Sequence, residues 1–478
     1  MSQTLLHGPQ HARWIRRAGV LLSALALVGC ATVGPDFTRP VAVAPAAWQA
    51  AQPHDGTPAA LVDWWAQFND PVLAGLIADA DAASPTLMAA AGRIAEARAG
   101  LTVSEANRFP TVDGSASAMR SGTERDTPVA ARTTGTVAVD SAWEIDLFGR
   151  VQRSTEAAEA RLAARQFDWH EARVSLAAEV ASSYVNYRAC RQLQSARADD
   201  VLSRTETNRM TRVSVDAGFT APADAELARA SLADARADLE DQRAQCEVTI
   251  KSLVALTGVP ETDLRSRLGE GVPPLPVPAA FVVDVVPLAV LSQRPDLAAA
   301  ERDLAAASAD IGAAEANRYP RLSLSGSVSL SSVLTGAAAT SLPWSIGPAL
   351  SLPIFNGGAL TAEVKGAEAR LMQQQAAYES AVRAAVREVE QALVTLDSAQ
   401  RREADARTAM EGYARFLAAT ETHWLAGGVS LLSLEDARRS ATTAQRKLIT
   451  LQRDRVLDWI SLYKAVGGGW IADAGDRS

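Results

Sequence analysis

The chain has 478 residues, of which 48% are hydrophobic but only 5% are aromatic. Much of the apolar content is alanine, and alanine together with Arg, Glu, Leu and Gln is typical of long helices. The formal charge of −8 and the lack of a Lys/Arg-rich stripe argue against a nucleic-acid partner. The five histidines do not stand at metal-ligand spacing, so the sequence predicts neither a metal site nor another cofactor.

The first thirty residues have the pattern of a targeting segment. Arginines precede an apolar run at 18–28, which is too short to span a bilayer as a stable helix. The run ends in LVGC, which resembles a bacterial lipobox with Cys30 as the lipidated residue; an ordinary signal peptide with an incidental cysteine is the alternative. Ala31 at the next position favours the outer membrane by analogy. We therefore expect removal of residues 1–29, acyl chains on Cys30 that bind outer-membrane lipid, and an extended segment over 30–62.

The second feature is internal repetition. SEANRFP at 104–110 returns as AEANRYP at 314–320, and further matches follow at about the same offset of 210 residues. Self-similarity at a fixed offset indicates two copies of one structural unit. We expect a first copy over 63–270, a second copy over 271–470, and an irregular C-terminal tail over 471–478.

Each copy is expected to begin with a helix, roughly 86–108 and 296–318, that a proline ends. Next come segments in which apolar residues alternate with Ser, Thr or other polar residues, a pattern typical of strands with one polar face. These strands are predicted at 111–122 and 133–146 in the first copy, and at 321–330 and 343–355 in the second.

After each pair of strands the pattern changes to long helices. Residues 150–217 contain no Gly or Pro and 359–426 contain only two glycines, so each run predicts roughly 100 Å of helix. Such lengths are far above the usual range and indicate a coiled coil or a helical tube. The turns AGFTAP at 217–222 and AGGVSL at 426–431 then reverse the chain into a second helix of about 35 residues.

No stretch of 18 apolar residues follows the targeting segment, so a membrane crossing would need strands rather than helices. Two strand pairs give four strands per chain, which cannot close into a barrel and would leave unpaired edges. Two chains would give eight strands, whose side chains fill the interior, whereas three chains give twelve and leave a lumen. The strand count favours a trimer if the function is passage, although the hairpins could instead be soluble β-structure packed on the helices.

Five segments carry a resemblance to the TolC/OprM-like outer-membrane factors, in particular the NodT subfamily of efflux lipoproteins: VGPDFTRP (33–40), WEIDLFGR (143–150), residues 294–320, LPIFNGG (352–358) and LYKAVGGGW (462–470). The resemblance implies an α+β membrane protein with two tandem repeats. Its expected assembly is a homotrimer in which a twelve-stranded transmembrane barrel continues as a long α-helical barrel in the periplasm. It also implies docking on a periplasmic adaptor and an inner-membrane pump, usually of the resistance-nodulation-division (RND) type.

No sequence pattern points to catalysis, because no Gly-rich phosphate loop follows a strand and no G-x-S-x-G elbow occurs. The resemblance implies the passive exit duct of a tripartite efflux pump, which conducts drugs or other small molecules to the exterior. The same fold would serve as the duct of a type I protein-secretion system. A coiled-coil scaffold lipoprotein without a channel is the rival from another class.

The gate of such a duct is expected at the periplasmic helix tips. Acidic residues gather at both tips, where threefold symmetry would turn each into a carboxylate ring: Asp224, Glu226, Glu435 and Asp436. By resemblance, Asp436 occupies the gate position of an LxDA tip motif. Three leucines beside it are the candidate apolar constriction: Leu431, Leu432 and Leu434. The alternative is that the acids cap helix N-termini and oppose the helix dipole.

Two cysteines remain after the lipid cysteine. Cys190 lies 28 residues before Gly218 and Cys246 lies 28 residues after it. An antiparallel hairpin that turns at this glycine would bring both cysteines to the same height on facing helices. Because the periplasm is oxidising, we predict a disulfide, with two buried free thiols as the alternative.

Overall fold

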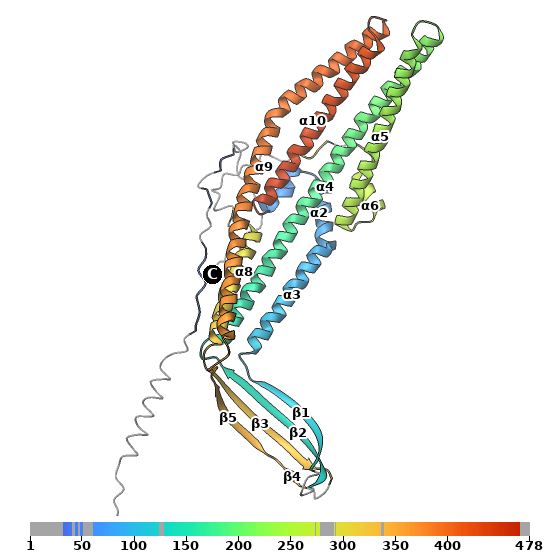
Figure 1. Ribbon diagram of the computed structural model, residues 1–478. Helices are drawn as coiled ribbons and strands as arrows, with labels where there is room; N and C mark the ends of the chain where they lie inside the picture. The colour runs from blue at the N-terminus through green and yellow to red at the C-terminus, as the bar shows by residue number, and fades with distance from the viewer. Residues whose placement is uncertain are drawn as a thin grey trace, which may run out of the picture. The chain divides into compact units, whose positions relative to one another are not determined.

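The computed structural model describes residues 32–40, 44–45, 48–50, 61–123, 129–272, 274–277, 291, 293–335 and 339–468 (Figure 1). Three predicted features lie outside the described residues: Cys30, which is expected to be lipidated, the signal peptide expected at 1–29 and the tail at 471–478. The chain forms two compact units, each of which combines distant parts of the sequence. Unit 1 comprises Met1–Pro40, Ile94–Arg165 and Ala300–Ala377, and unit 2 comprises Val41–Arg93, Gln166–Ala299 and Tyr378–Ser478.

Unit 1 contains an antiparallel sheet whose strands lie side by side in Figure 1. β1 (Thr111–Thr123) pairs with β2 (Val129–Ile145), and β2 pairs with β3 (Arg321–Val333) across the two halves of the sequence. β3 then pairs with both β4 (Thr340–Ser341) and β5 (Trp344–Ser351). The predicted fourth strand corresponds to β5, which ends at Ser351 rather than at residue 355. The short strand β4 lies before the predicted range, and Pro343, which has no N–H to donate to the ladder, lies between β4 and β5.

The register gives the sheet two different faces. Residues paired directly across antiparallel strands point to the same side of the sheet. One row of paired residues is apolar and consists of Gly114, Val139, Val328 and Trp344; the adjacent row is polar and consists of Asp113, Asp140, Ser327 and Ser345. Large apolar side chains are exposed on the first face, namely Val112, Val137, Val139, Val328, Leu330, Trp344, Ile346 and Leu350. The alternation expected from the sequence is thus present across all the strands.

In both halves of the sequence, the helices before and after the strands follow the same order along the chain. Helices α3 (Pro85–Ala106) and α8 (Pro295–Ala316) have 22 residues each and precede β1 and β3. Helices α4 (Arg150–Asp216) and α9 (Ala359–Leu425) have 67 residues each and follow the strands. Their bounds agree with the sequence prediction to within two residues, which confirms a mostly helical chain with a sheet.

Unit 2 contains two helical hairpins and a compact aromatic core. α4 turns into α5 (Pro222–Thr257), and α9 turns into α10 (Leu431–Ala465), as Figure 1 shows. The core includes Trp64, whose ring stacks on Tyr463 of α10 with centroids 5.4 Å apart. Trp64 belongs to the 3-10 helix η1 (Leu61–Phe68), which the sequence analysis did not predict. The sequence analysis also did not predict the helices α2 (Pro71–Ala83) and α6 (Glu261–Leu268).

In the described part of the chain, no single helix combines the length and apolar composition needed to span a membrane. Only α2 and α3 taken together, with a bend of 43° between them, pass that test of length and composition.

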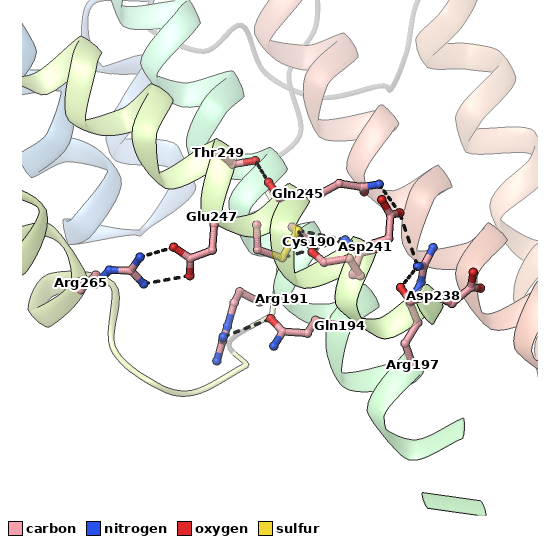
Figure 2. The surroundings of a disulfide bond; sticks show 12 residues. Cys190, Arg191, Gln194, Arg197, Asp238, Asp241, Gln245, Glu247, Thr249 and Arg265 are labelled. Carbon is pink, nitrogen blue, oxygen red and sulfur yellow. Dashed lines mark hydrogen bonds and ion pairs between the residues drawn. A yellow bond between two sulfur atoms is a disulfide. The ribbon is translucent and has the colours of Figure 1, made fainter. Parts of the chain in front are cut away.

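A disulfide joins α4 to α5 within unit 2. Cys190 and Cys246 are both buried, and their Cα atoms are 5.6 Å apart (Figure 2). Close to the bond, Arg197 of α4 donates a hydrogen bond to the backbone carbonyl of Asp238 on α5. The second hairpin contains no cysteine, so this covalent link belongs to the first hairpin alone.

Replacing both cysteines by alanine should destabilise unit 2. The bonded residues are 56 positions apart, and closing such a loop in the unfolded chain corresponds to about 4 kcal/mol in the entropy model. In urea titrations of the detergent-purified protein, C190A/C246A should unfold at a lower midpoint than wild type. Reductant should lower the wild-type midpoint and leave that of the variant unchanged. Equal midpoints without reductant would show that the bond contributes nothing to stability.

Candidate functional site

The helix tips of unit 2 bring the predicted gate residues of both hairpins together. The hydroxyl of Ser430 caps α10 by accepting a hydrogen bond from the N–H of Ser433 at 3.2 Å. Behind this cap, Leu431 and Leu434 pack on Ala228 of α5 in a small apolar cluster. Among the three leucines proposed for the constriction, Leu432 has the exposed side chain, at 56%.

Two of the four predicted gate carboxylates point into solvent. The side chain of Asp436 is 60% exposed and lies 3.5 Å from Arg439 on the next turn. Glu226 is equally open and forms an ion pair with Arg229 at 2.5 Å. Exposed pairs of this kind contribute little to stability, so neither carboxylate is held as Glu435 is, inside the protein.

Asp224 is half-buried in the first turn of α5. The N-cap of that helix is Ala221, whose methyl side chain cannot accept a hydrogen bond from the first turn. The negative charge of Asp224 within that turn interacts favourably with the helix dipole. Asp224 also lines a cavity of about 520 Å³ between the two hairpin tips, together with Phe219, Trp424 and Leu425. The half-buried carboxylate of Asp224 thus interacts with the helix dipole and also faces this cavity.

Glu435 is buried and fully engaged with partners on three helices. Its Oε2 accepts hydrogen bonds from Nη1 of Arg204 on α4 at 2.7 Å and from the hydroxyl of Ser231 on α5 at 2.6 Å. Its Oε1 accepts a hydrogen bond from Nη1 of Arg438 at 2.7 Å. Because these donors satisfy the charge inside the protomer, Glu435 is not a free carboxylate in this structure.

Arg438 extends this arrangement to the fourth helix. Its side chain is 2% exposed. Its Nη2 donates to the hydroxyls of Ser203 and Thr207 on α4, at 2.9 and 3.2 Å, and to a carboxylate oxygen of Glu421 on α9 at 3.1 Å. The buried network centred on Glu435 and Arg438, here called the tip network, therefore connects all four helices of the two hairpins.

The sequence analysis identified Glu435 but not its partners. Arg438 follows it by three residues on α10, a spacing that places both side chains on one helix face. The partners on α4 and α5 lie more than 200 residues away along the chain, and the sequence holds no signal for them. Among the residues that the structure describes, no group of three or more His, Cys, Asp or Glu side chains could hold a metal ion.

Replacing Arg438 by methionine should weaken the junction between the hairpins. The change leaves the Glu421 and Glu435 carboxylates with fewer donors, and removing one partner of a buried ion pair typically costs about 3 kcal/mol. The adjacent Arg439→Met is the matched control, because Arg439 is exposed and its ion pair should be worth less than about 0.5 kcal/mol. Hydrogen exchange at the first turns of α5 and α10 should accelerate in R438M and remain unchanged in R439M. Identical exchange in both variants would contradict the role of the tip network.

A further carboxyl on α10 has an altered pKa. Burial raises the pKa of Asp458 from 3.8 to about 6, and the nearby charge of Asp454 acts in the same direction. The hydroxyl of Thr395 on α9 and the charge of Arg402 oppose the increase. Ionisation of Asp458 is therefore less favourable in the folded protein than in the unfolded chain.

This shift predicts how stability depends on pH. The folded-state pKa exceeds the unfolded-state value, so the folded protein binds the proton more tightly, and Asp458 makes stability fall as pH rises from about 4 to about 6. Above that interval, Asp458→Asn should be more stable than wild type by about 1 kcal/mol, because the carboxyl is only partly buried. The advantage should vanish near pH 4. Thermal melts at pH 4 and pH 7.5 test the sign, and an advantage of equal size at both pH values would contradict it.

Comparison with known proteins identifies relatives along almost the whole chain. The family model described as outer membrane efflux protein matches residues 76–259 and again residues 286–468. "Nodulation protein T" of Rhizobium leguminosarum bv. trifolii is 30% identical over 467 residues, covering 95% of this chain and 97% of the relative. "Solvent efflux pump outer membrane protein SrpC" of Pseudomonas putida is 31% identical over 475 residues, covering 94% and 97%.

A solved structure, that of the outer-membrane channel OprN, has the same fold. It superimposes with a TM-score of 0.82 at 29% identity, and the match covers 92% of this chain and 99% of that one. The family resemblance inferred from the sequence is thereby confirmed.

Proposed function

Because the chain belongs to the outer membrane efflux protein family, we propose that it is the exit duct of a tripartite efflux pump. It is an outer-membrane efflux protein and not an enzyme. In the proposed role, drugs or other small molecules pass through it to the exterior, and a pump in the inner membrane supplies the energy. The observation that carries this role is the sheet of unit 1, with one apolar face, one polar face and unpaired edges.

The edges of the sheet support a trimer. Within the described chain, β1 pairs only with β2, and β4 and β5 pair only with β3, so both edges present unpaired backbone groups. Three copies joined edge to edge would form a barrel twelve strands around, which is wide enough for a lumen. The apolar face would then contact lipid and the polar face would line water. The two matches of one family model, which begin 210 residues apart, support tandem repeats and a quasi-sixfold helical barrel in the periplasm.

The duct requires a periplasmic adaptor and an inner-membrane pump, which we propose to be of the RND type. The relative SrpC is named as part of a solvent efflux pump. We infer that the adaptor docks at the hairpin tips, where the cavity beside Asp224 offers apolar groups from both turns. Phe219 at its rim is 86% exposed, as expected for a residue that a protein partner covers. We also propose that acyl chains on Cys30 anchor the protein in the outer membrane.

The gate is proposed at the same tips. In a trimer, Asp436 and Glu226 would form rings of exposed carboxylates, with Leu432 beside them as an apolar constriction. Asp224 would contribute a further, partly screened charge. Glu435 and Leu434 would act indirectly, because the tip network and the small apolar cluster hold them inside the protomer.

Planar-bilayer recordings test both the duct and the gate. The lipidated protein should have the mass of a trimer in detergent and show small, cation-selective conductance steps. Asp436→Ala should raise the single-channel conductance severalfold, because removal of the carboxylate ring weakens the constriction. Glu240→Ala is the matched control, since Glu240 is also exposed and paired three residues along its helix with Arg243. A monomer without conductance would refute the duct, and equal conductance of D436A and wild type would refute the gate residue.

A further inference from the structure

A single buried arginine holds the first described residues of the chain on unit 1. Arg153, in the first turn of α4, has a side chain that is 8% exposed. Its Nε donates to the carbonyl of Val33 at 3.2 Å, and its Nη2 donates to the carbonyl of Gly34 at 3.4 Å and to the carboxylate of Asp36 at 2.7 Å. Its Nη1 donates to Glu156 at 2.9 Å. Two of the three guanidinium nitrogens, Nε and Nη2, thus bind the N-terminal segment.

Residues 32–36 are here called the strap. The strap packs so closely on α8 that its contact requires glycine at two positions. Gly34 has φ +89°, and a Cβ atom there would lie 2.3 Å from the Cα of Gly312 on α8. A Cβ on Gly312 would in turn lie 2.8 Å from the side chain of Arg153. Such distances are far below van der Waals contact, so the strap, α8 and Arg153 are packed without spare room. A segment that merely passed over the surface would not need this fit.

The strap lies at the end of the sheet where the strands connect to the helices. The N–H of Val33 donates to the carbonyl of Phe148, three residues after β2 ends, at 3.2 Å. The register aligns the helix-side ends of β2, β3 and β5 in one row. Directly after β5, Ile354 and Phe355 are 90% and 91% exposed. The strap and these exposed apolar side chains therefore both lie at the helix-side end of the sheet.

We propose that Arg153 is a positioning residue for the lipid anchor. This role rests on the proposed acylation of Cys30, which precedes Thr32 by two residues and so lies within about 7 Å of it along the chain. By docking the strap at the end of the apolar face, Arg153 brings the acyl chains to the leaflet that meets this end. Ile354 and Phe355 contact the same leaflet. The lipid then holds the channel body directly rather than through a flexible tether.

A second contact on the far side of the strap gives a way to measure the docking. Arg39 forms an ion pair with Glu301 of α8 at 2.7 Å. The bond between Phe37 and Thr38 therefore lies between two attachment points. Chymotrypsin must draw several residues on either side of this bond into its cleft, so cleavage there reports release of the strap.

The experiment compares Arg153→Met with Arg161→Met in the purified, acylated protein. Arg161 is on the same helix and pairs with Asp310 of α8, but it does not touch the strap. Chymotrypsin should cut at Phe37 roughly tenfold faster in R153M than in wild type, and R161M should behave as wild type. Cutting at Phe219, in the exposed turn before α5, is the internal control and should proceed at one rate in all three proteins. R153K keeps the positive charge but lacks the forked donors of a guanidinium, so chymotrypsin should cut it at Phe37 at a rate between those of wild type and R153M.

The outcomes separate this role from the proposed function. Intact mass before digestion reports the acyl chains, and their absence would remove the lipid anchor and with it the role of Arg153. An acylated protein cut at Phe37 equally fast in wild type and R153M would overturn the docking, while leaving the duct and its lipid in place. Faster cutting of R153M at both Phe37 and Phe219 would assign Arg153 to general stability and would likewise overturn it.

Discussion

The backbone hydrogen bonds at the edges of the sheet are the constraint on which the rest of the structure depends. Within the described chain, β1 on one side and β4 with β5 on the other leave a row of N–H and C=O groups without strand partners. The apolar face makes water a poor solvent for this sheet, and hydrocarbon offers no hydrogen bonds in its place. In the trimer proposed above, further copies of the same strands would satisfy both requirements. The doubled order of elements then follows, because each half of the chain supplies one pair of strands to a common sheet.

The two hairpins of unit 2 are held by interactions of different kinds. The first is closed by the disulfide between Cys190 and Cys246, which thermal motion does not break. The two hairpins are joined to each other by the tip network, whose hydrogen bonds and ion pairs can exchange partners. Buried ion pairs add little net stability but strongly favour one geometry, because an unpaired buried charge is costly. A gate that opens and closes needs a junction of this second kind, so the proposed movement would occur between hairpins rather than within the first one.

The sequence predicted the long elements well and the contacts between them poorly. Runs without Gly or Pro gave α4 and α9, and alternation gave the strands, since both signals are local. The 3-10 helix η1 and the helices α2 and α6 were missed because they are short and depend on aromatic packing by residues such as Trp64 and Tyr463. The strand β4 was also missed, because it has only two residues and no alternation pattern can show in so short a segment.

The same limit applies to the functional residues. Sequence reasoning found the acids at the tips and the pair of cysteines, because both lie at fixed distances from the turns. It treated Glu435 as a ring carboxylate, whereas Arg204 and Ser231, far along the chain, hold it inside the protomer. Arg153 carried no signal either, since three of its four acceptors, the carbonyls of Val33 and Gly34 and the carboxylate of Asp36, lie some 120 positions earlier. Charges whose partners are distant in sequence can be assigned only when the fold is known.

The polar face of the sheet bears on whether the proposed barrel is filled or hollow. Asp113 of β1 stands directly opposite Asp140 of β2, and both are exposed. Like charges in such a pair oppose strand pairing by up to about 1 kcal/mol in water, and the repulsion grows steeply as the dielectric constant falls. A barrel filled by its own side chains would place this pair in a dry interior. The pair is better tolerated where water and counter-ions reach it, so in the proposed barrel this face would line a hydrated space. A twelve-stranded closure would provide that space, whereas an eight-stranded one would not.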